Sequence, residues 1–162
     1  MAENKTNAMR ILDKSGVLYS ILGYDPGDGE IHGTAVAEKI GRPPGSVFKT
    51  LVAHQGNQIY VFVIPVAEEL DLKKAAKAAG EKKVEMLPVK ELLKWTGYVR
   101  GGCSPVGMKK LYPTFLDASA EGLDKMAVSA GRIGTQMELD PGELARQVNA
   151  RFVPLIKETD NE

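Results

Sequence analysis

The order of predicted elements along the chain indicates an α+β fold, in which helices are interleaved with hairpin-like pairs of strands. Three observations support this prediction. Residues 46–65 form an apolar-rich segment divided by a Gln-Gly-Asn turn, as expected for a central hairpin. Residues 125–139 form a second strand pair around a glycine turn. Helices are interleaved with these strand pairs, and this pattern favours an α+β fold over a doubly wound parallel sheet.

Each helix is delimited by a residue that favours its start or its end. Side-chain oxygens at the start accept hydrogen bonds from the first backbone N–H groups, and glycine closes the end. The helices are predicted over residues 6–16, 34–41, 71–80, 88–97 and 140–150. The remaining strands are predicted over residues 17–22, 84–86 and 113–119. Residues 24–33 are predicted as a loop, and the Arg-Pro-Pro-Gly segment 42–45 excludes regular structure.

Composition restricts the possible function classes. The chain has 162 residues, of which 43% are hydrophobic, so residues 1–162 are predicted to form a single domain. Its 21 Lys and Arg balance 21 Asp and Glu, so no global field attracts nucleic acid, and RNA contact requires a local basic patch or a partner. One cysteine makes no internal disulfide, and no apolar run reaches the roughly 20 residues of a membrane span. The expected setting is the cytoplasm, without membrane or DNA as partners.

The segment Gly-Gly-Cys-Ser-Pro-Val-Gly, residues 101–107, permits two interpretations. Cys103 could act as a nucleophile if a base lowered its pKa, but only His32 and His54 are available and neither is adjacent in sequence. Alternatively, the loop could present its backbone amides to a phosphate or a developing oxyanion. Lys109 and Lys110 would add positive charge beside such a cradle.

Lys49 is the other unusual residue, because it interrupts the apolar stretch Val-Phe-Lys-Thr-Leu-Val. An ammonium group there either reaches solvent through strand alternation or is held for ligand contact. No His, Cys or carboxylate cluster has metal-ligand spacing, so neither a metal nor another cofactor is predicted.

Four stretches follow one another in the order and spacing of a known family: SVFKTLV, ELDLKKAAKAAGEKKVEML, TGYVRGGCSPVGMKKLYPTFLD and VSAGRIG. From about Leu12 to Val148 the chain resembles the YbaK/EbsC family of free-standing aminoacyl-tRNA deacylases, which are related to the editing domain of bacterial prolyl-tRNA synthetase. The resemblance implies an α+β fold with a mixed, partly closed β-sheet flanked by helices. It implies hydrolysis of the ester in mischarged tRNA(Pro), with cysteinyl-tRNA(Pro) as the expected substrate. Alanyl-tRNA(Pro) is the close alternative.

The resemblance also assigns site residues. Lys49, Gly101 and Gly102 are the expected catalytic residues, with Lys49 at the pocket mouth near the terminal adenosine and the loop amides along the aminoacyl carbonyl. The expected substrate-binding residues are Tyr24, His32, Thr50, Ser104, Pro105 and Ser129. Catalysis would use the substrate's own side chain or a tRNA ribose hydroxyl in place of a protein nucleophile. Prolyl-tRNA synthetase is the expected protein partner.

The chain departs from the family pattern at three positions. Cys103 replaces an aliphatic residue, so the family mechanism does not depend on this thiol. His32 lies near a common aromatic position, and Ile133 occupies a position where a basic residue is common. Two further function classes remain open: a small-ester or thioester hydrolase that uses Cys103, and a non-catalytic module that binds an RNA 3′ end.

Overall fold

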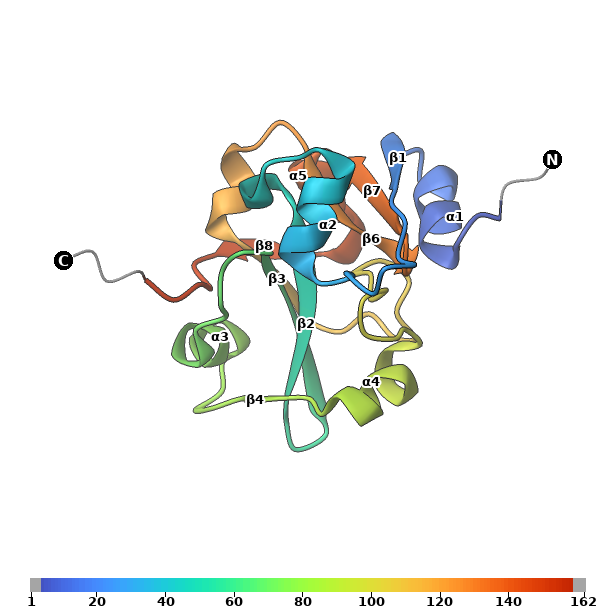
Figure 1. The fold of residues 1–162 in the computed structure, drawn as a ribbon. Coiled ribbons are helices and arrows are strands. Elements are labelled where there is room, and N and C mark those ends of the chain that lie inside the picture. Colours follow the sequence, from blue (N-terminus) through green and yellow to red (C-terminus); the bar gives the residue numbers. More distant parts are fainter. Residues whose placement is uncertain (1–3, 159–162) are drawn as a thin grey trace.

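The computed structural model describes residues 4–158 (Figure 1). Its α-helices are α1 (Asn7–Lys14), α2 (Gly33–Ile40), α3 (Leu72–Ala79), α4 (Val89–Thr96) and α5 (Pro141–Val148). Its strands are β1 (Tyr19–Gly23), β2 (Phe48–Gln55), β3 (Gln58–Pro65), β4 (Glu85–Met86), β5 (Thr114–Asp117), β6 (Met126–Arg132), β7 (Thr135–Leu139) and β8 (Arg151–Val153). Two short 3₁₀ helices span Pro44–Ser46 and Ala118–Gly122.

The strands form two sheets. An antiparallel sheet has the order β1-β7-β6, and a five-stranded sheet has the order β4-β2-β3-β5-β8. The larger sheet is mixed, because β3 pairs with β5 and β5 with β8 in parallel, whereas β2 is antiparallel to β3 and β4. A parallel bridge between Val47 and Ala127 links the two sheets. The predicted α+β fold with a mixed sheet is therefore confirmed.

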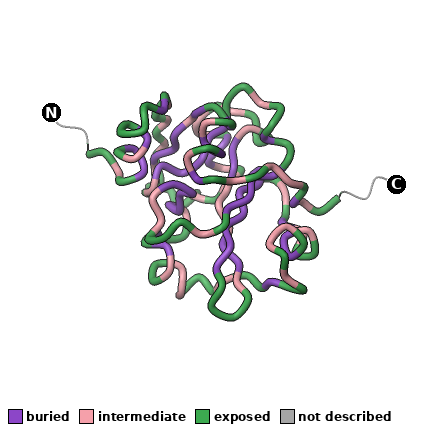
Figure 2. Tube along the Cα trace, turned by 180° about the vertical axis from the view of Figure 1, so that it is seen from behind, coloured by how far each residue is buried: buried purple, intermediate pink, exposed green. Residues whose placement is uncertain are grey.

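The central hairpin is the most buried part of the fold. Every residue of β3 after Gln58 is buried, and the purple segments in Figure 2 follow this hairpin through the middle of the molecule. One core cluster, which includes Phe48, Val61 and Val63, packs between the sheets and the helices α1 and α5. A second cluster, which includes Ala53 and Phe62, lies beneath α3. One face of the hairpin therefore packs in the first cluster, and the opposite face packs in the second.

Local capping signals explain most helix boundaries. The side chains of Thr6, Asp71 and Asp140 accept hydrogen bonds from the first turns of α1, α3 and α5. Gly41, Gly80 and Gly97 adopt left-handed conformations directly after α2, α3 and α4, as predicted.

The structure corrects several details of the sequence prediction. Pro44 starts a 3₁₀ turn that Pro43 precedes, so the proline segment retains one turn of regular structure. Pro88 is the residue before α4 and not part of its first turn. Strand β8 was not predicted, because its partner β5 is remote in sequence. Within residues 4–158, no helix is both long enough and apolar enough to cross a membrane.

Candidate active site

Lys49 lies on β2 and is half-buried. Burial lowers the pKa of its ammonium group, and the carboxylates of Glu69 and Glu68 partly offset this effect. Within residues 4–158 the ammonium has no hydrogen bond or ion pair, although buried charges in proteins are usually paired. The positive charge of Lys49 therefore has no ion-pair partner in the described part of the chain.

The bridge between the sheets brings Lys49 close to β6. Lys49 and Ser129 each lie two residues beyond the Val47–Ala127 bridge, on strands that run parallel there. Because strand side chains alternate, Lys49 projects from the same face as Val47, and Ser129 from the same face as Ala127. Val47 and Ala127 pack together in one cluster beneath α2. The structure thus places Lys49 and Ser129 on the same side of the molecule.

Thr50 contributes to a different surface of β2. Its side chain projects from the face opposite Lys49, together with Phe48. The Thr50 hydroxyl is buried and has no hydrogen-bond partner among the described residues. Leu87 N donates to the Val52 carbonyl (2.9 Å) on the edge of β2 that faces away from β3, and Thr50 presents its backbone N–H and C=O at the same edge. Thr50 therefore offers both a backbone donor and a backbone acceptor beside the site.

The glycine loop packs on the turn between β6 and β7. A Cβ added to Gly102 would lie 2.9 Å from Ile133 N and 3.1 Å from the Arg132 carbonyl carbon, so only glycine permits this approach. Gly101 has a φ of +88°, and an added Cβ would lie 3.1 Å from Ile31 Cδ1. The Gly102 N–H donates to the Val99 carbonyl (3.0 Å) and is therefore engaged in the loop's own turn. The Gly102 amide is therefore not free to donate to a ligand.

Ser104 and Pro105 lie inside the loop and are both buried. The Ser104 hydroxyl accepts a hydrogen bond from Val106 N (3.2 Å), and the Tyr98 hydroxyl donates to the Val106 carbonyl (2.5 Å). These contacts fix the conformation of the loop from its inner side.

Cys103 is buried, and burial raises the pKa of its thiol to about 12, although a hydrogen bond with Thr96 partly offsets the shift. A thiol with this pKa is almost fully protonated at neutral pH and is a poor nucleophile. His54 lies near the far end of β2, where its Nδ1 is 3.0 Å from the Gly56 carbonyl oxygen. The environment of Cys103 is that of a packed side chain.

Tyr24 and His32 lie at opposite ends of the loop before α2. Tyr24 N donates to the Gly134 carbonyl (2.9 Å), which joins this loop to the same β6–β7 turn that supports Gly102. The Tyr24 hydroxyl is buried without a partner among the described residues. His32 is exposed, and its Nε2 lies 2.9 Å from Glu30 Oε1.

Sequence reasoning missed Gln136, which is directly opposite Ser129 in the β6–β7 pair. Its side-chain carbonyl oxygen is buried and lacks a partner in the described range. Paired strand residues project from the same face, so Gln136 and Ser129 are neighbours. The pairing of residue 129 with residue 136 follows from the glycine turn, but the loss of a hydrogen-bond partner depends on packing.

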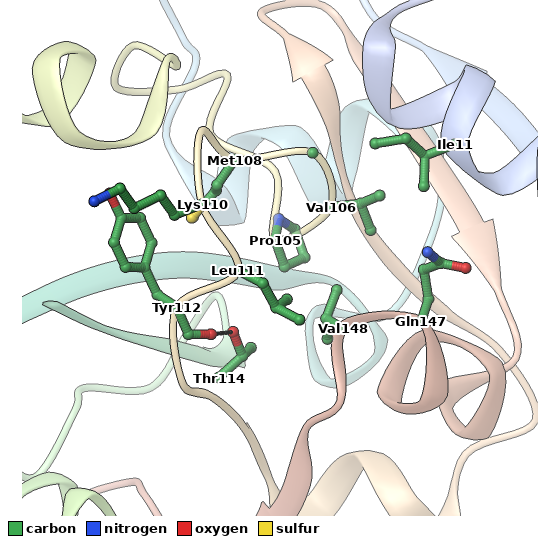
Figure 3. Close-up of a pocket in the computed structure, with 11 residues that line it drawn as sticks. Ile11, Pro105, Val106, Met108, Lys110, Leu111, Tyr112, Thr114, Gln147 and Val148 are labelled. Carbon is green, nitrogen blue, oxygen red and sulfur yellow. Dashed lines mark hydrogen bonds between the residues drawn. The ribbon is translucent and has the colours of Figure 1, made fainter.

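A separate pocket lies behind the glycine loop, between α1 and α5 (Figure 3). It has a volume of ≈ 240 Å³, and its lining is mostly apolar, with Ile11, Val106, Leu111 and Val148 among the contributors. Of the predicted site residues it contains Pro105 alone. Of the predicted site residues, Lys49 and Ser129 therefore lie on the same side of the inter-sheet bridge, and Tyr24, Gly101 and Gly102 lie against the β6–β7 turn or the residues next to it.

Comparison with known proteins connects this arrangement to a family. The model of the aminoacyl-tRNA editing domain matches residues 32–147. The chain belongs to the aminoacyl-tRNA editing domain family. This editing domain is 45% identical, over 155 residues and 94% of each chain, to the Enterococcus faecalis protein named "Putative Cys-tRNA(Pro)/Cys-tRNA(Cys) deacylase EbsC". The resemblance to the YbaK/EbsC family and the predicted enzyme class, an aminoacyl-tRNA deacylase, are confirmed.

Two solved structures share the fold of this editing domain. A "putative trans-editing enzyme for prolyl tRNA synthetase" matches 96% of this chain and 100% of its own, with a TM-score of 0.80 and 22% identity. "Hypothetical protein APE2540" matches 91% of this chain and 97% of its own, with a TM-score of 0.82 and 22% identity. At this identity, the two matches establish the fold.

Proposed function

We propose that this editing domain hydrolyses the ester of mischarged tRNA(Pro) in trans, with cysteinyl-tRNA(Pro) as its preferred substrate. The name of the Enterococcus faecalis relative supports the cysteinyl group, since that protein shares 45% of its residues with this chain over 94% of both lengths. The proposal treats residues 1–162 as a single editing domain that acts in the cytoplasm, where translation takes place.

The observation that carries the proposal is the unpaired, half-buried ammonium of Lys49 on the same side of the molecule as Ser129. A cation held out of water without a protein partner is suited to an anionic or strongly polar ligand group. The terminal adenosine of tRNA and its phosphate have this character. The buried hydroxyl of Tyr24 and the open backbone edge at Thr50 provide further polar groups for the same nucleotide.

The proposed mechanism uses positioning without a protein nucleophile. Cys103 is buried with a raised pKa, which weighs against the hydrolase that depends on this thiol. Water attacks the ester carbonyl carbon, and the carbon–oxygen bond to the ribose breaks to release the free amino acid and the tRNA. The substrate thiol or the free ribose hydroxyl of the terminal adenosine orients this water in place of a protein group. The glycine loop holds the aminoacyl carbonyl, and oriented donors of this kind contribute on the order of 10²–10³ to a rate. Ser104 and Pro105 shape the loop, whereas Tyr24, His32, Thr50 and Ser129 surround the bound end.

The decisive experiment is deacylation of tRNA(Pro) charged in turn with cysteine, alanine and proline by the purified protein. Faster hydrolysis of the cysteinyl ester than of the other two supports the proposal. Faster hydrolysis of the alanyl ester would show that alanyl-tRNA(Pro) is the preferred substrate. Binding of all three without hydrolysis would indicate the non-catalytic module. A parallel assay with Cys103→Ala tests the thiol, because the proposed mechanism retains activity in this variant.

A further inference from the structure

Helix α4 and the loop that follows it carry a concentration of positive charge. Five exposed cations lie within residues 90–110, and we call them the basic face: Lys90, Lys94, Arg100, Lys109 and Lys110. Glu91 is the one carboxylate in this segment, in a chain whose total charges balance. This segment is therefore locally positive, and a second positive cluster of similar size lies on and just after α3, at Lys73, Lys74, Lys77, Lys82 and Lys83.

Specific contacts hold the loop that contains Lys109 against the end of α4. Lys109 N donates to the Thr96 carbonyl (3.1 Å), and Lys109 Nζ donates to the Lys94 carbonyl (3.1 Å). The Tyr112 hydroxyl donates to the Trp95 carbonyl (2.6 Å), which fastens the returning chain against the end of α4. Lys90 and Lys94 are one helical turn apart and share a side of α4. Figure 1 shows α4 directly beside the loop that contains residues 101–110.

Most of this charge has no carboxylate partner. Lys94 is 3.7 Å from Glu91, whereas Lys90, Arg100, Lys109 and Lys110 have no ion pair with any residue from 4 to 158. Some other surface cations are paired: Lys39 contacts Asp28, Lys157 contacts Glu69, and Arg146 contacts Glu143. Lys73, Lys77 and Lys82 resemble the basic face in having no ion pair within residues 4–158, but they lie away from the glycine loop. The basic face thus retains its positive field for an external partner.

The basic face also adjoins the candidate site at the glycine loop. Arg100 directly precedes Gly101, so the positive charge reaches the glycine loop. The other borders are acidic: the loop before α2 carries Asp25, Asp28 and Glu30, and Glu68 and Glu69 act on Lys49. A polyanion that enters the site is repelled at the acidic borders and attracted at the basic one.

We propose that the basic face binds the phosphates of the tRNA acceptor arm and thereby sets the direction from which the charged 3′ end enters the site. This inference rests on the proposed function, because it takes the substrate to be a tRNA. Exposed Val89 and Leu93 lie on the same helix, so a protein surface is the competing occupant. The charge favours RNA: four unpaired cations suit a phosphate backbone, which presents negative charge at regular intervals.

The test uses a variant with Lys90→Gln, Lys94→Gln, Lys109→Gln and Lys110→Gln. The matched control carries Lys73→Gln, Lys77→Gln, Lys82→Gln and Lys83→Gln, four exposed lysines on or just after α3, which lies on the other side of the molecule from α4 (Figure 1). Circular dichroism and a melting curve establish that both variants are folded. The measurements are kcat and KM on cysteinyl-tRNA(Pro), and the affinity for uncharged tRNA(Pro) between 50 and 200 mM salt.

The basic-face variant is expected to bind tRNA at least about tenfold more weakly than the wild type. The slope of log K against log salt should become shallower by about 3, because each of the four lost phosphate contacts contributes roughly 0.7–0.9 to that slope. Its KM rises while kcat stays near the wild-type value, and the control matches the wild type. Equal tRNA affinity and salt slope in the variant and the wild type would overturn the inference. So would a variant that keeps its own tRNA affinity and loses only stimulation by added prolyl-tRNA synthetase, because the face would then bind protein.

Failure of the two proposals can be told apart. A wild-type protein that binds tRNA through the basic face but releases no amino acid contradicts the deacylase function alone. If the wild type and the basic-face variant deacylate cysteinyl-tRNA(Pro) equally well, the result contradicts the proposed role of the basic face alone.

Discussion

Lys49 illustrates how a single residue can be located by sequence and explained by structure. Its position within an apolar strand marks it as unusual, and the fold leaves its ammonium half-buried with no partner in the described chain. An unpaired charge of this kind contributes little to stability, because desolvation is not offset by an ion pair. The proposed ligand contact would explain why an ammonium group stands at this position.

Lys49→Ala is expected to reduce deacylation by about 100-fold or more, because loss of one oriented donor has that effect in other enzymes. The melting temperature should stay close to that of the wild type. Single-turnover deacylation and a melting curve measure the two effects, with Lys73→Ala, an exposed lysine of α3, as the control. Wild-type turnover by folded Lys49→Ala would remove Lys49 from the site.

The glycine loop should tolerate changes at its cysteine and not at its glycines. Cys103→Ser should keep most of the activity, because a thiol with a pKa of about 12 supplies no nucleophile at neutral pH. Gly102→Ala should lose activity, because its Cβ would lie 2.9 Å from a backbone nitrogen that cannot move alone. Gly45→Ala is the matched control, since a Cβ there has no atom within 4 Å.

Initial deacylation rates of these three variants measure the difference. A covalent adduct on Cys103, trapped with substrate and detected by mass spectrometry, would contradict this account of the loop. So would full activity in Gly102→Ala.

At the scale of single elements, capping residues determine where helices begin, and an acidic cap makes the stability of its helix depend on pH. The Asp71 carboxylate accepts hydrogen bonds from Lys73 N (2.9 Å) and Lys74 N (3.0 Å) at the start of α3. These backbone hydrogen bonds, with help from the nearby lysines, hold the pKa of Asp71 below its usual value of 3.8. The cap therefore stabilises the folded state most when Asp71 is ionised.

The stabilisation from Asp71 is expected to be complete above about pH 4 and to decline as the pH falls toward the lowered folded-state pKa. The sign follows because the unfolded chain binds the proton more readily than the folded chain. Urea unfolding at pH 7 and at pH 3 measures the effect. Asp71→Asn keeps a capping oxygen, so its urea midpoint should lie closer to the wild-type value at pH 3 than at pH 7. An equal gap at both pH values would contradict the role of the carboxylate.

At the scale of the whole molecule, neutrality and the local basic face together govern RNA binding. The five cations of the basic face can neutralise only a few phosphates, and the rest of the surface has a compensating negative excess. Affinity for tRNA should therefore be modest at physiological salt. A partner that supplies additional RNA contacts would raise the affinity.

We expect the isolated protein to bind tRNA(Pro) weakly, with a slope of log K against log salt no steeper than about −4. Added prolyl-tRNA synthetase should tighten the binding. Fluorescence anisotropy of labelled tRNA across a salt series measures both quantities, with an unrelated synthetase as the control. Tight binding by the isolated protein at physiological salt, or no effect of the synthetase, would contradict the expectation.

Much of the fold was predictable because its signals are local. Thr6, Asp71 and Asp140 cap helices within three residues of themselves, and Gly41, Gly80 and Gly97 end them by adopting a left-handed conformation. The β2–β3 hairpin follows from two apolar runs around a short turn. The pattern around Lys49 and the glycine loop also identified the family, because both stretches are contiguous in sequence.

The tertiary structure alone decided how these pieces meet. The parallel pairing of β8 with β5, the bridge from Val47 to Ala127, and the contact of Gly102 with the β6–β7 turn each join residues remote in sequence. The same packing buries Cys103 and raises the pKa of its thiol, and it leaves the Gln136 side-chain oxygen without a hydrogen-bond partner in the described range. A sequence encodes caps and periodicity through neighbours a few residues apart. Burial and hydrogen-bond satisfaction depend on which distant surfaces pack together, and only the folded chain determines that.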